Sequence, residues 1–136
     1  MVADSVEQVV YNYLQADSTF KNYFNGIYWV EADWVEADAD TIPYLVFWMV
    51  DDAGINTLLN KVQQGEARIQ FDLWDTSKIR GARLRTKVAE KVKAMNEYRD
   101  GYHIIVTGIT EQTIQRASDT DPFHFVVDGI VKWSKE

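Results

Sequence analysis

Cysteine is absent from this sequence of 136 residues, which also has only two histidines and two prolines. Without cysteine the chain can form no disulfide, no thiolate metal site and no cysteine nucleophile. A histidine-based metal site would need both His103 and His124, so we predict no metal site. The glycines are scattered and form no phosphate-cradling loop, and the His-Glu-x-x-His pattern of zinc proteases is missing.

Long hydrophobic runs are missing as well. The longest, from Tyr44 to Val50, has the length of a strand, whereas a membrane-spanning helix needs about 20 apolar residues. The N-terminus shows no basic region followed by an apolar stretch. We therefore predict neither a signal peptide nor a membrane partner.

What the sequence does have is an apolar content of 46 % and a high aromatic content of 13 %. This composition and length predict one folded domain and exclude a disordered chain. Periodicity predicts a helix at 4–24 capped by Asp4 or Ser5, a long helix at 77–98, and strands at 27–30, 43–50, 66–74, 102–109, 112–117 and 123–133. We predict a long connection at 51–65, which could include a short helix at 55–62. The order predicts the α+β class, with a mostly antiparallel sheet and helices on one face.

Charge is distributed unevenly along the chain, which has a net charge of −7. Residues 1–52 contain ten acids and one base, whereas residues 76–99 contain eight bases and two acids. Such asymmetry indicates either an interaction surface or complementary parts of one fold.

An acidic tandem repeat occupies residues 29–38, where Trp-Val-Glu-Ala-Asp occurs twice in succession. A calcium loop alternates carboxylates in this way, but it also needs a central glycine, and this stretch has none. We therefore predict a solvated acidic loop, which includes Glu36 and Asp38.

Candidate catalytic groups are few. Asp72, on the polar side of the strand at 66–74, is the best single candidate for acid–base chemistry. An ordinary role, as the partner of a basic residue or as an edge carboxylate, is the favoured interpretation of Asp72, and His103 and His124 are expected to be packed or edge side chains. The residues give no positive evidence for an enzyme, and we predict that the protein is not one.

Candidate interface residues come from three segments. On the long helix, Gly81 is expected to allow close packing, and a basic stripe lies beside the apolar one; this stripe predicts a solvated face, a contact with an acidic neighbouring chain, or a contact with DNA phosphates. The strand at 43–50 is apolar on both faces, so it is either covered twice or shared with a partner. The apolar residues of the connection also need cover. The residues we assign to an interface are Arg80, Arg83, Lys87, Lys91, Leu58, Leu59, Trp48, Glu36 and Asp38.

A series of features recurs in one order along most of the chain. After the first helix comes Ile42-Pro43-Tyr44-Leu45-Val46-Phe47, then the connection, and then Ile69-Gln70-Phe71-Asp72-Leu73-Trp74. A long helix rich in alanines and bases follows, and a Phe/Val-rich stretch from Phe123 to Trp133 ends the series. In this order and pattern the chain resembles the tail-completion, or tail-terminator, proteins of long-tailed bacteriophages. The acidic repeat has no counterpart in that pattern.

The resemblance implies a structural role without catalytic residues or cofactors. It implies a six-membered ring at the head-proximal end of the tail tube, which closes in solution or only on the tube. It further implies contacts with the major tail protein and with the head-completion or connector protein, and DNA passing through the ring without specific binding. The expected location is the virion tail, after synthesis in the host cytoplasm.

Three alternatives stay open at this point. A head-completion component of the connector belongs to the same structural class. A small-ligand-binding or enzymatic α+β domain would need a roomy apolar pocket. A nucleic-acid-binding accessory protein would bind DNA in a salt-dependent way through Arg80, Arg83 and Lys87.

Overall fold

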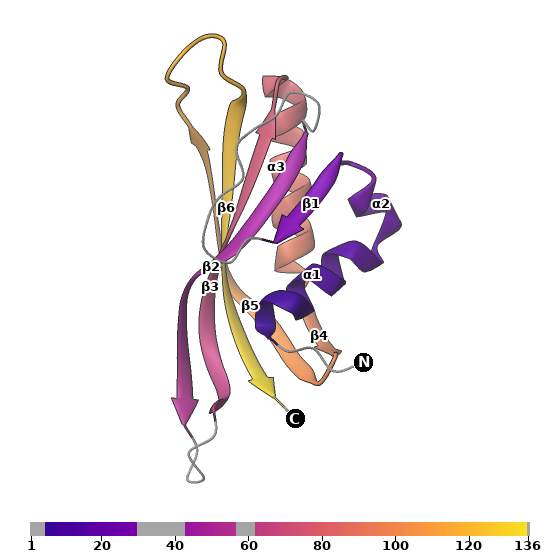
Figure 1. Ribbon diagram of the computed structural model, residues 1–136, viewed down its shortest axis with the longest axis vertical. Helices are drawn as coiled ribbons and strands as arrows, with labels where there is room; N and C mark the ends of the chain where they lie inside the picture. Colours follow the sequence, from indigo (N-terminus) through magenta and orange to yellow (C-terminus); the bar gives the residue numbers. More distant parts are fainter. Residues whose placement is uncertain (1–4, 30–42, 57–61, 136) are drawn as a thin grey trace.

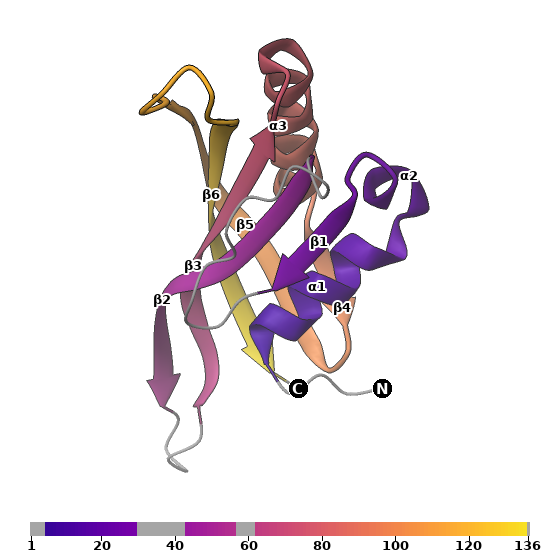
Figure 2. The ribbon, with the colours of Figure 1, turned by 45° about the horizontal axis from the view of Figure 1, so that its top comes forward.

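A single curled sheet of six strands carries helices on one face (Figures 1 and 2). The computed structural model describes residues 5–29, 43–56 and 62–135. In chain order the elements are α1 Val6–Ala16, α2 Ser18–Lys21, β1 Gly26–Trp29, β2 Tyr44–Asn56, β3 Val62–Asp75, α3 Lys78–Lys93, β4 Asn96–Arg99, β5 Tyr102–Ile114 and β6 Phe123–Lys135. None of the described helices is long and apolar enough to cross a membrane.

The strands follow the spatial order β1-β2-β3-β6-β5-β4. The pairings β2–β3, β3–β6, β6–β5 and β5–β4 are antiparallel, whereas β1 runs parallel to β2. The predicted combination of helices with a largely antiparallel sheet is therefore confirmed in its coarse form, and the parallel edge pair is a departure from it.

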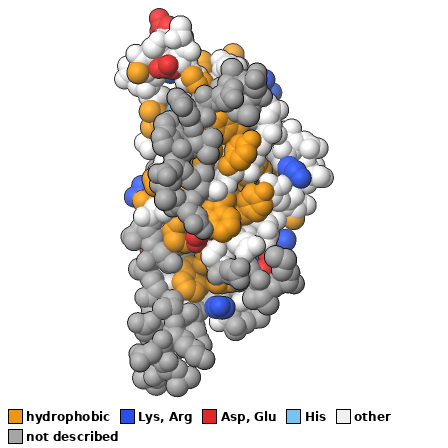
Figure 3. Space-filling view, in the orientation of Figure 1, with side chains coloured by type: hydrophobic (Ala, Val, Ile, Leu, Met, Phe, Trp, Pro, Cys, Tyr) orange, Lys and Arg blue, Asp and Glu red, His pale blue; other side chains and the backbone are white. Residues whose placement is uncertain are grey.

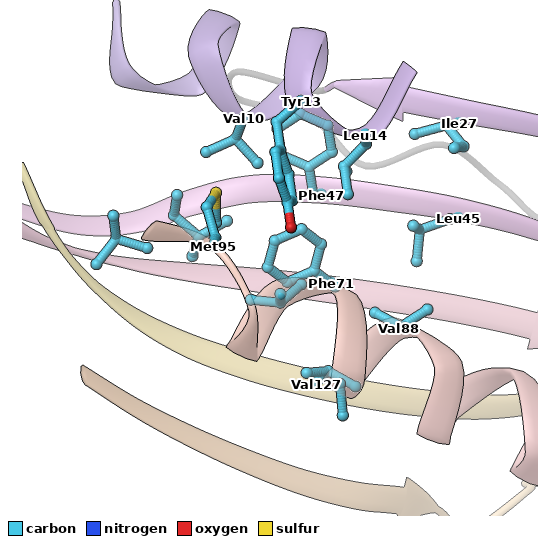
Figure 4. Packing of buried hydrophobic residues seen from close by; sticks show 14 of the residues in the cluster. Val10, Tyr13, Leu14, Ile27, Leu45, Phe47, Phe71, Val88, Met95 and Val127 are labelled. Atoms are coloured by element: carbon cyan, nitrogen blue, oxygen red, sulfur yellow. The ribbon is translucent and has the colours of Figure 1, made fainter. Parts of the chain in front are cut away.

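The core lies between the helices and one face of the sheet, which we call the inner face (Figure 4). Side chains alternate across a strand, so odd-numbered residues of β2, β3 and β6, such as Phe47, Phe71 and Val127, point inward. Val10 of α1 and Val88 of α3 pack on them from the helices. The predicted apolar helical stripes are thus the buried faces of α1 and α3.

The predicted helix at 4–24 is two helices. Ser5 caps α1 by accepting a hydrogen bond from the backbone N–H of Gln8, as expected. Asp17 then adopts an extended backbone and caps α2, where its carboxylate accepts the N–H groups of Thr19 and Phe20 at 3.0 and 3.1 Å. An aspartate followed by Ser-Thr is a strong N-cap, and it ends one helix by starting another.

The predicted helix at 77–98 is also too long. Ser77 caps α3 and the helix ends at Lys93, while residues 96–99 form the short strand β4. Asp100 and Gly101 join β4 to β5 with φ angles of 54° and 88°. Two successive left-handed residues are what a two-residue hairpin turn requires, and Asp-Gly is the sequence that favours it.

Two segments that were predicted to lie between strands are themselves part of strands. The predicted strands at 102–109 and 112–117 are one strand, β5, which has an irregularity between Val106 and Gly108 and continues without a break through residues 110–111. The predicted connection at 51–65 is largely a hairpin, since β2 extends to Asn56 and β3 begins at Val62. The short helix expected at 55–62 is therefore wrong at both of its ends. Its middle lies outside the described residues, as does the acidic repeat after Trp29.

Candidate functional site

The position of α3 decides which of its side chains face solvent. Gly81 lies against the Phe125 ring of β6, and a Cβ at Gly81 would collide with that ring. The absence of a side chain therefore lets α3 sit close to the sheet, as the sequence predicted. On the opposite side of α3, Ile79 is 85 % exposed and Arg83 is exposed.

Arg80, predicted as an interface cation, has an internal partner. Its Nε and Nη2 donate to Asp75 Oδ2 and Oδ1 at 2.8 and 2.5 Å, and the Asp75 carboxylate is fully buried. The hydrogen bonds from Arg80 to Asp75 raise the pKa of the guanidinium above its ordinary value. The pair joins the start of α3 to the end of β3, so Arg80 contributes to the fold.

Lys91, also predicted for the interface, joins helices within the chain. Its Nζ donates to Asp17 Oδ2 at 3.0 Å and lies 4.3 Å from the centre of the Tyr13 ring. The Tyr13 hydroxyl in turn donates to the Lys91 carbonyl at 2.8 Å. The backbone N–H of Phe20 and, after it, the Lys91 ammonium lower the pKa of Asp17 below its ordinary value.

Arg83 and Lys87 are the cations of the predicted stripe without a strong internal partner. Arg83 forms no ion pair or hydrogen bond among the described residues. Within the described part of the chain Lys87 makes only a 3.9 Å pair with Glu90, which is itself exposed. Together with Ile79, which was not part of the predicted stripe, they form what we call the α3 patch (Ile79, Arg83 and Lys87).

On the outer face of the sheet, away from the helices, Asp72 is the centre of a polar network. Its carboxylate accepts hydrogen bonds from Trp48 Nε1 at 3.0 Å and from Gln70 Nε2 at 3.0 and 3.1 Å. His124 Nε2 lies 2.7 Å from Asp72 Oδ1. Asp72 is only 6 % exposed, so its oxygens are committed to these neighbours. The ordinary role expected of Asp72 matches this arrangement.

Aromatic rings continue the network along the outer face. The His124 ring stacks on Trp74 at 4.2 Å between centroids, and Trp74 stacks on Tyr44 at 5.3 Å. Tyr44, Val46 and Trp74 form a second, small hydrophobic cluster. The two apolar faces of the strand at 43–50 thus belong to two clusters, and Trp48 lies half-buried beside the second.

The remaining predicted residues lie outside the description. Glu36, Asp38, Leu58 and Leu59 fall in stretches that the structure does not describe. Among the residues that it does describe, no group of three or more His, Asp or Glu side chains is arranged to hold a metal ion. The hydrogen-bonded role of His124 and the internal partner of Lys91 had no local sequence signal, because Asp72 and Asp17 come from distant parts of the chain. The partner of Arg80 is local, since Asp75 lies only five residues before it, and an acid just before the start of the helix was a signal that could have found it.

Comparison with known proteins gives a likeness in fold. A chain of the structure titled "Virion of native gene transfer agent (GTA) particle" superposes with a TM-score of 0.60 at 13 % sequence identity. The match covers 99 % of this chain and 97 % of that one, so the whole architecture is shared. No protein-family model matches the sequence, and no curated protein matches it.

Proposed function

We propose that this protein is a structural component of a virion-like particle. The observation that carries the proposal is the end-to-end similarity of its fold to a chain of a gene transfer agent virion. The small share of identical residues means that the similarity concerns architecture alone. The shared fold is observed, whereas the assignment of this protein to a virion-like particle is our proposal.

Within that class we propose a tail terminator whose copies form a six-membered ring on the end of a tail tube. The order of sequence features supports this finer role. In this proposal the ring meets the tail-tube protein on one side and a connector protein on the other, and DNA passes through its centre. A net charge of −7 per subunit suits a channel in which DNA slides without binding.

The charge distribution supports ring closure. Copies in a ring meet head to tail, so one surface must complement a different surface of the same chain. The cations of the α3 patch and the acidic N-terminal third of the sequence are of opposite sign and can steer such an encounter. The proposed role needs no catalytic group, and the polar atoms of Asp72 are used within the sheet.

Native mass spectrometry over a concentration series, at low and moderate salt, tests the ring. We expect a species of about 94 kDa, six times the chain mass of 15.7 kDa. Should the ring close only on a tube, addition of the protein to polymerising tail tubes should shorten them in electron micrographs. A monomer at every concentration combined with unchanged tube lengths would contradict the proposal.

A further inference from the structure

Two long strands are each covered along only part of their outer edge. β1 pairs with Tyr44–Phe47 of β2, and among the described residues nothing pairs with the outer edge of β2 from 48 to 56. β4 pairs with Tyr102–Ile105 of β5, and the Met95 carbonyl accepts the N–H of Val106. The described residues leave the outer edge of β5 open from 107 to 114. We call these stretches the β2 edge (48–56) and the β5 edge (107–114).

The β2 edge of one copy and the β5 edge of the next would run antiparallel in a ring. β2, β3, β6 and β5 alternate in direction across the sheet. In a second copy related by rotation about a ring axis, β2 runs in the same sense as in the first copy. That β2 is therefore antiparallel to the β5 beside it, and the two edges have similar lengths. The alternation continues across the boundary between copies.

The space beside the β5 edge is open on both faces of the sheet. On the helix side a groove of about 500 Å³ lies between α3 and β5, with Ala89, Lys93 and Ile109 among its lining residues. On the outer side a hollow of about 440 Å³ is lined by residues that include Thr110 and Ile130. An added strand would have these hollows above and below it and would lie beside Arg85 of α3, which pairs with Glu111 and donates to Thr113.

Apolar side chains stand at both edges. Val50 of the β2 edge is 39 % exposed, while Ile114 of the β5 edge and the neighbouring Ile130 are 37 % and 40 % exposed. Figure 3 shows hydrophobic side chains gathered in the region where Figure 1 places β1, β2 and α1. Open edges with few charges and exposed apolar groups are templates for pairing with another chain.

We infer that neighbouring copies of this chain join by antiparallel pairing of the β2 edge of one copy with the β5 edge of the next. The inference rests on the ring part of the proposed function and names its interface. The pairing is heterologous, as a ring requires. It also removes both open edges at once, since each copy offers one of each kind.

The strand register gives the geometry of such a ring. Asp52, the middle of the β2 edge, is level with Ala67, Val131 and Val106 in successive strands. The middle of the β5 edge lies between Thr110 and Glu111, which are level with Asp128 and Val127 of β6. Because β5 carries an extra residue between Val106 and Gly108, this offset is between three and four residues, or ~12 Å at ~3.3 Å per residue. Across four strands ~4.8 Å apart this offset gives a strand tilt of ~30°, somewhat below the ~35–45° typical of closed barrels.

Cysteine cross-linking tests the pairing, because the chain has no cysteine of its own. The register brings Val50 of one copy near Gln112 of the next. Val50→Cys is combined in turn with Glu111→Cys, Gln112→Cys and Thr113→Cys under mild oxidation. In at least one double variant we expect a series of cross-linked oligomers on denaturing gels, from the dimer up to the six-membered ring. Each single variant should stay monomeric on denaturing gels, and a mixture of two single variants should stop at dimers.

The outcomes separate this inference from the ring itself. A ring seen by native mass spectrometry without any cross-link would overturn the strand pairing and leave the proposed function intact. Dimers from Gln112→Cys alone would indicate pairing of β5 with β5 and would also overturn it. Absence of both ring and cross-links, on tail tubes as well as in solution, would contradict both.

Proline scanning gives a second readout. Successive amides of a strand point to opposite sides, so of Thr110→Pro and Glu111→Pro one removes an outward N–H and the other an inward one. We expect one variant to fold normally and lose assembly, and the other to lose the β5–β6 pairing. The alanine variants at both positions keep the amide and should assemble. Normal assembly of both proline variants would overturn the inference.

Discussion

The close neighbours of Asp72 determine whether this carboxylate is a catalytic or a structural group. The strand alternation places it correctly on the polar side of β3, where a catalytic acid was conceivable. Its oxygens instead receive hydrogen bonds from Trp48 and Gln70, and His124 lies at 2.7 Å. The carboxylate thereby links side chains of β2, β3 and β6, which makes it a structural group of the outer face.

Replacing Asp72 by alanine should therefore destabilise the monomer. A fully buried donor left without an acceptor costs about 1–3 kcal/mol, and the donors to Asp72 are half-buried. We therefore expect a loss of about 1 kcal/mol in the free energy of unfolding, measured by urea denaturation. Asp72→Asn keeps one acceptor oxygen and should lose less. Asp119→Ala, at an exposed carboxylate, is the control and should leave stability unchanged. Equal stability of Asp72→Ala and the wild type would show that the network contributes nothing.

At the scale of elements, the N-terminal helices are held to α3 by polar contacts as well as by the core. Asp17 starts α2 and also receives the Lys91 ammonium, and the Tyr13 hydroxyl donates to the Lys91 carbonyl. One aspartate therefore ends α1, begins α2 and contacts α3.

The lowered pKa of Asp17 predicts how this contact responds to acid. Because the folded pKa lies below the unfolded one, the stabilisation is complete above the unfolded pKa and is lost as pH falls through the folded pKa. The difference in unfolding free energy between the wild type and Asp17→Asn should thus shrink on acidification and vanish at the lowest pH. Urea denaturation between pH 7 and pH 2 measures it, and a difference that does not depend on pH would contradict the assignment.

Element types were more predictable than element ends. Strong alternation identified β3 and β6, and helical spacing identified α1 and α3. The missed boundaries had signals that compete with periodicity: the Asp17 cap inside a helical pattern, and Asp100-Gly101 after the helix pattern of α3. The predicted break between the strands at 102–109 and 112–117 is absent, because β5 pairs with β6 on both sides of its local irregularity between Val106 and Gly108.

At the scale of the whole molecule, the basic residues of α3 fall into two groups, those with a strong internal carboxylate partner and those without one among the described residues. Arg80 is neutralised by Asp75, which lies five residues before it, and Lys91 by Asp17, which only the tertiary fold brings near. Spacing along a helix identifies a basic stripe but not the carboxylates that reach it. Arg83 and Lys87 are what remains for a partner chain, and they lie beside the exposed Ile79.

Reversing these two charges should weaken assembly without unfolding the monomer. Arg83→Glu combined with Lys87→Glu removes the positive part of the α3 patch, which has no strong internal partner to lose. We expect a smaller assembled fraction by light scattering and an unchanged circular dichroism spectrum. Lys21→Glu combined with Lys132→Glu makes the same charge change at exposed sites elsewhere and is the matched control. Unchanged assembly of the first variant would remove the α3 patch from the interface.

The central pairing of β3 with β6 has a consequence for the speed of folding. The hairpins β2–β3 and β5–β6 each join neighbours in sequence, whereas β3 and β6 are separated by α3, β4 and β5. Contacts between distant segments form slowly, because the chain loses loop entropy before the pairing stabilises it. The two hairpins can therefore form early and independently, and their docking along β3 and β6 sets the folding rate. Until that docking occurs, each newly made chain exposes two strand edges that the folded sheet covers, one on β3 and one on β6.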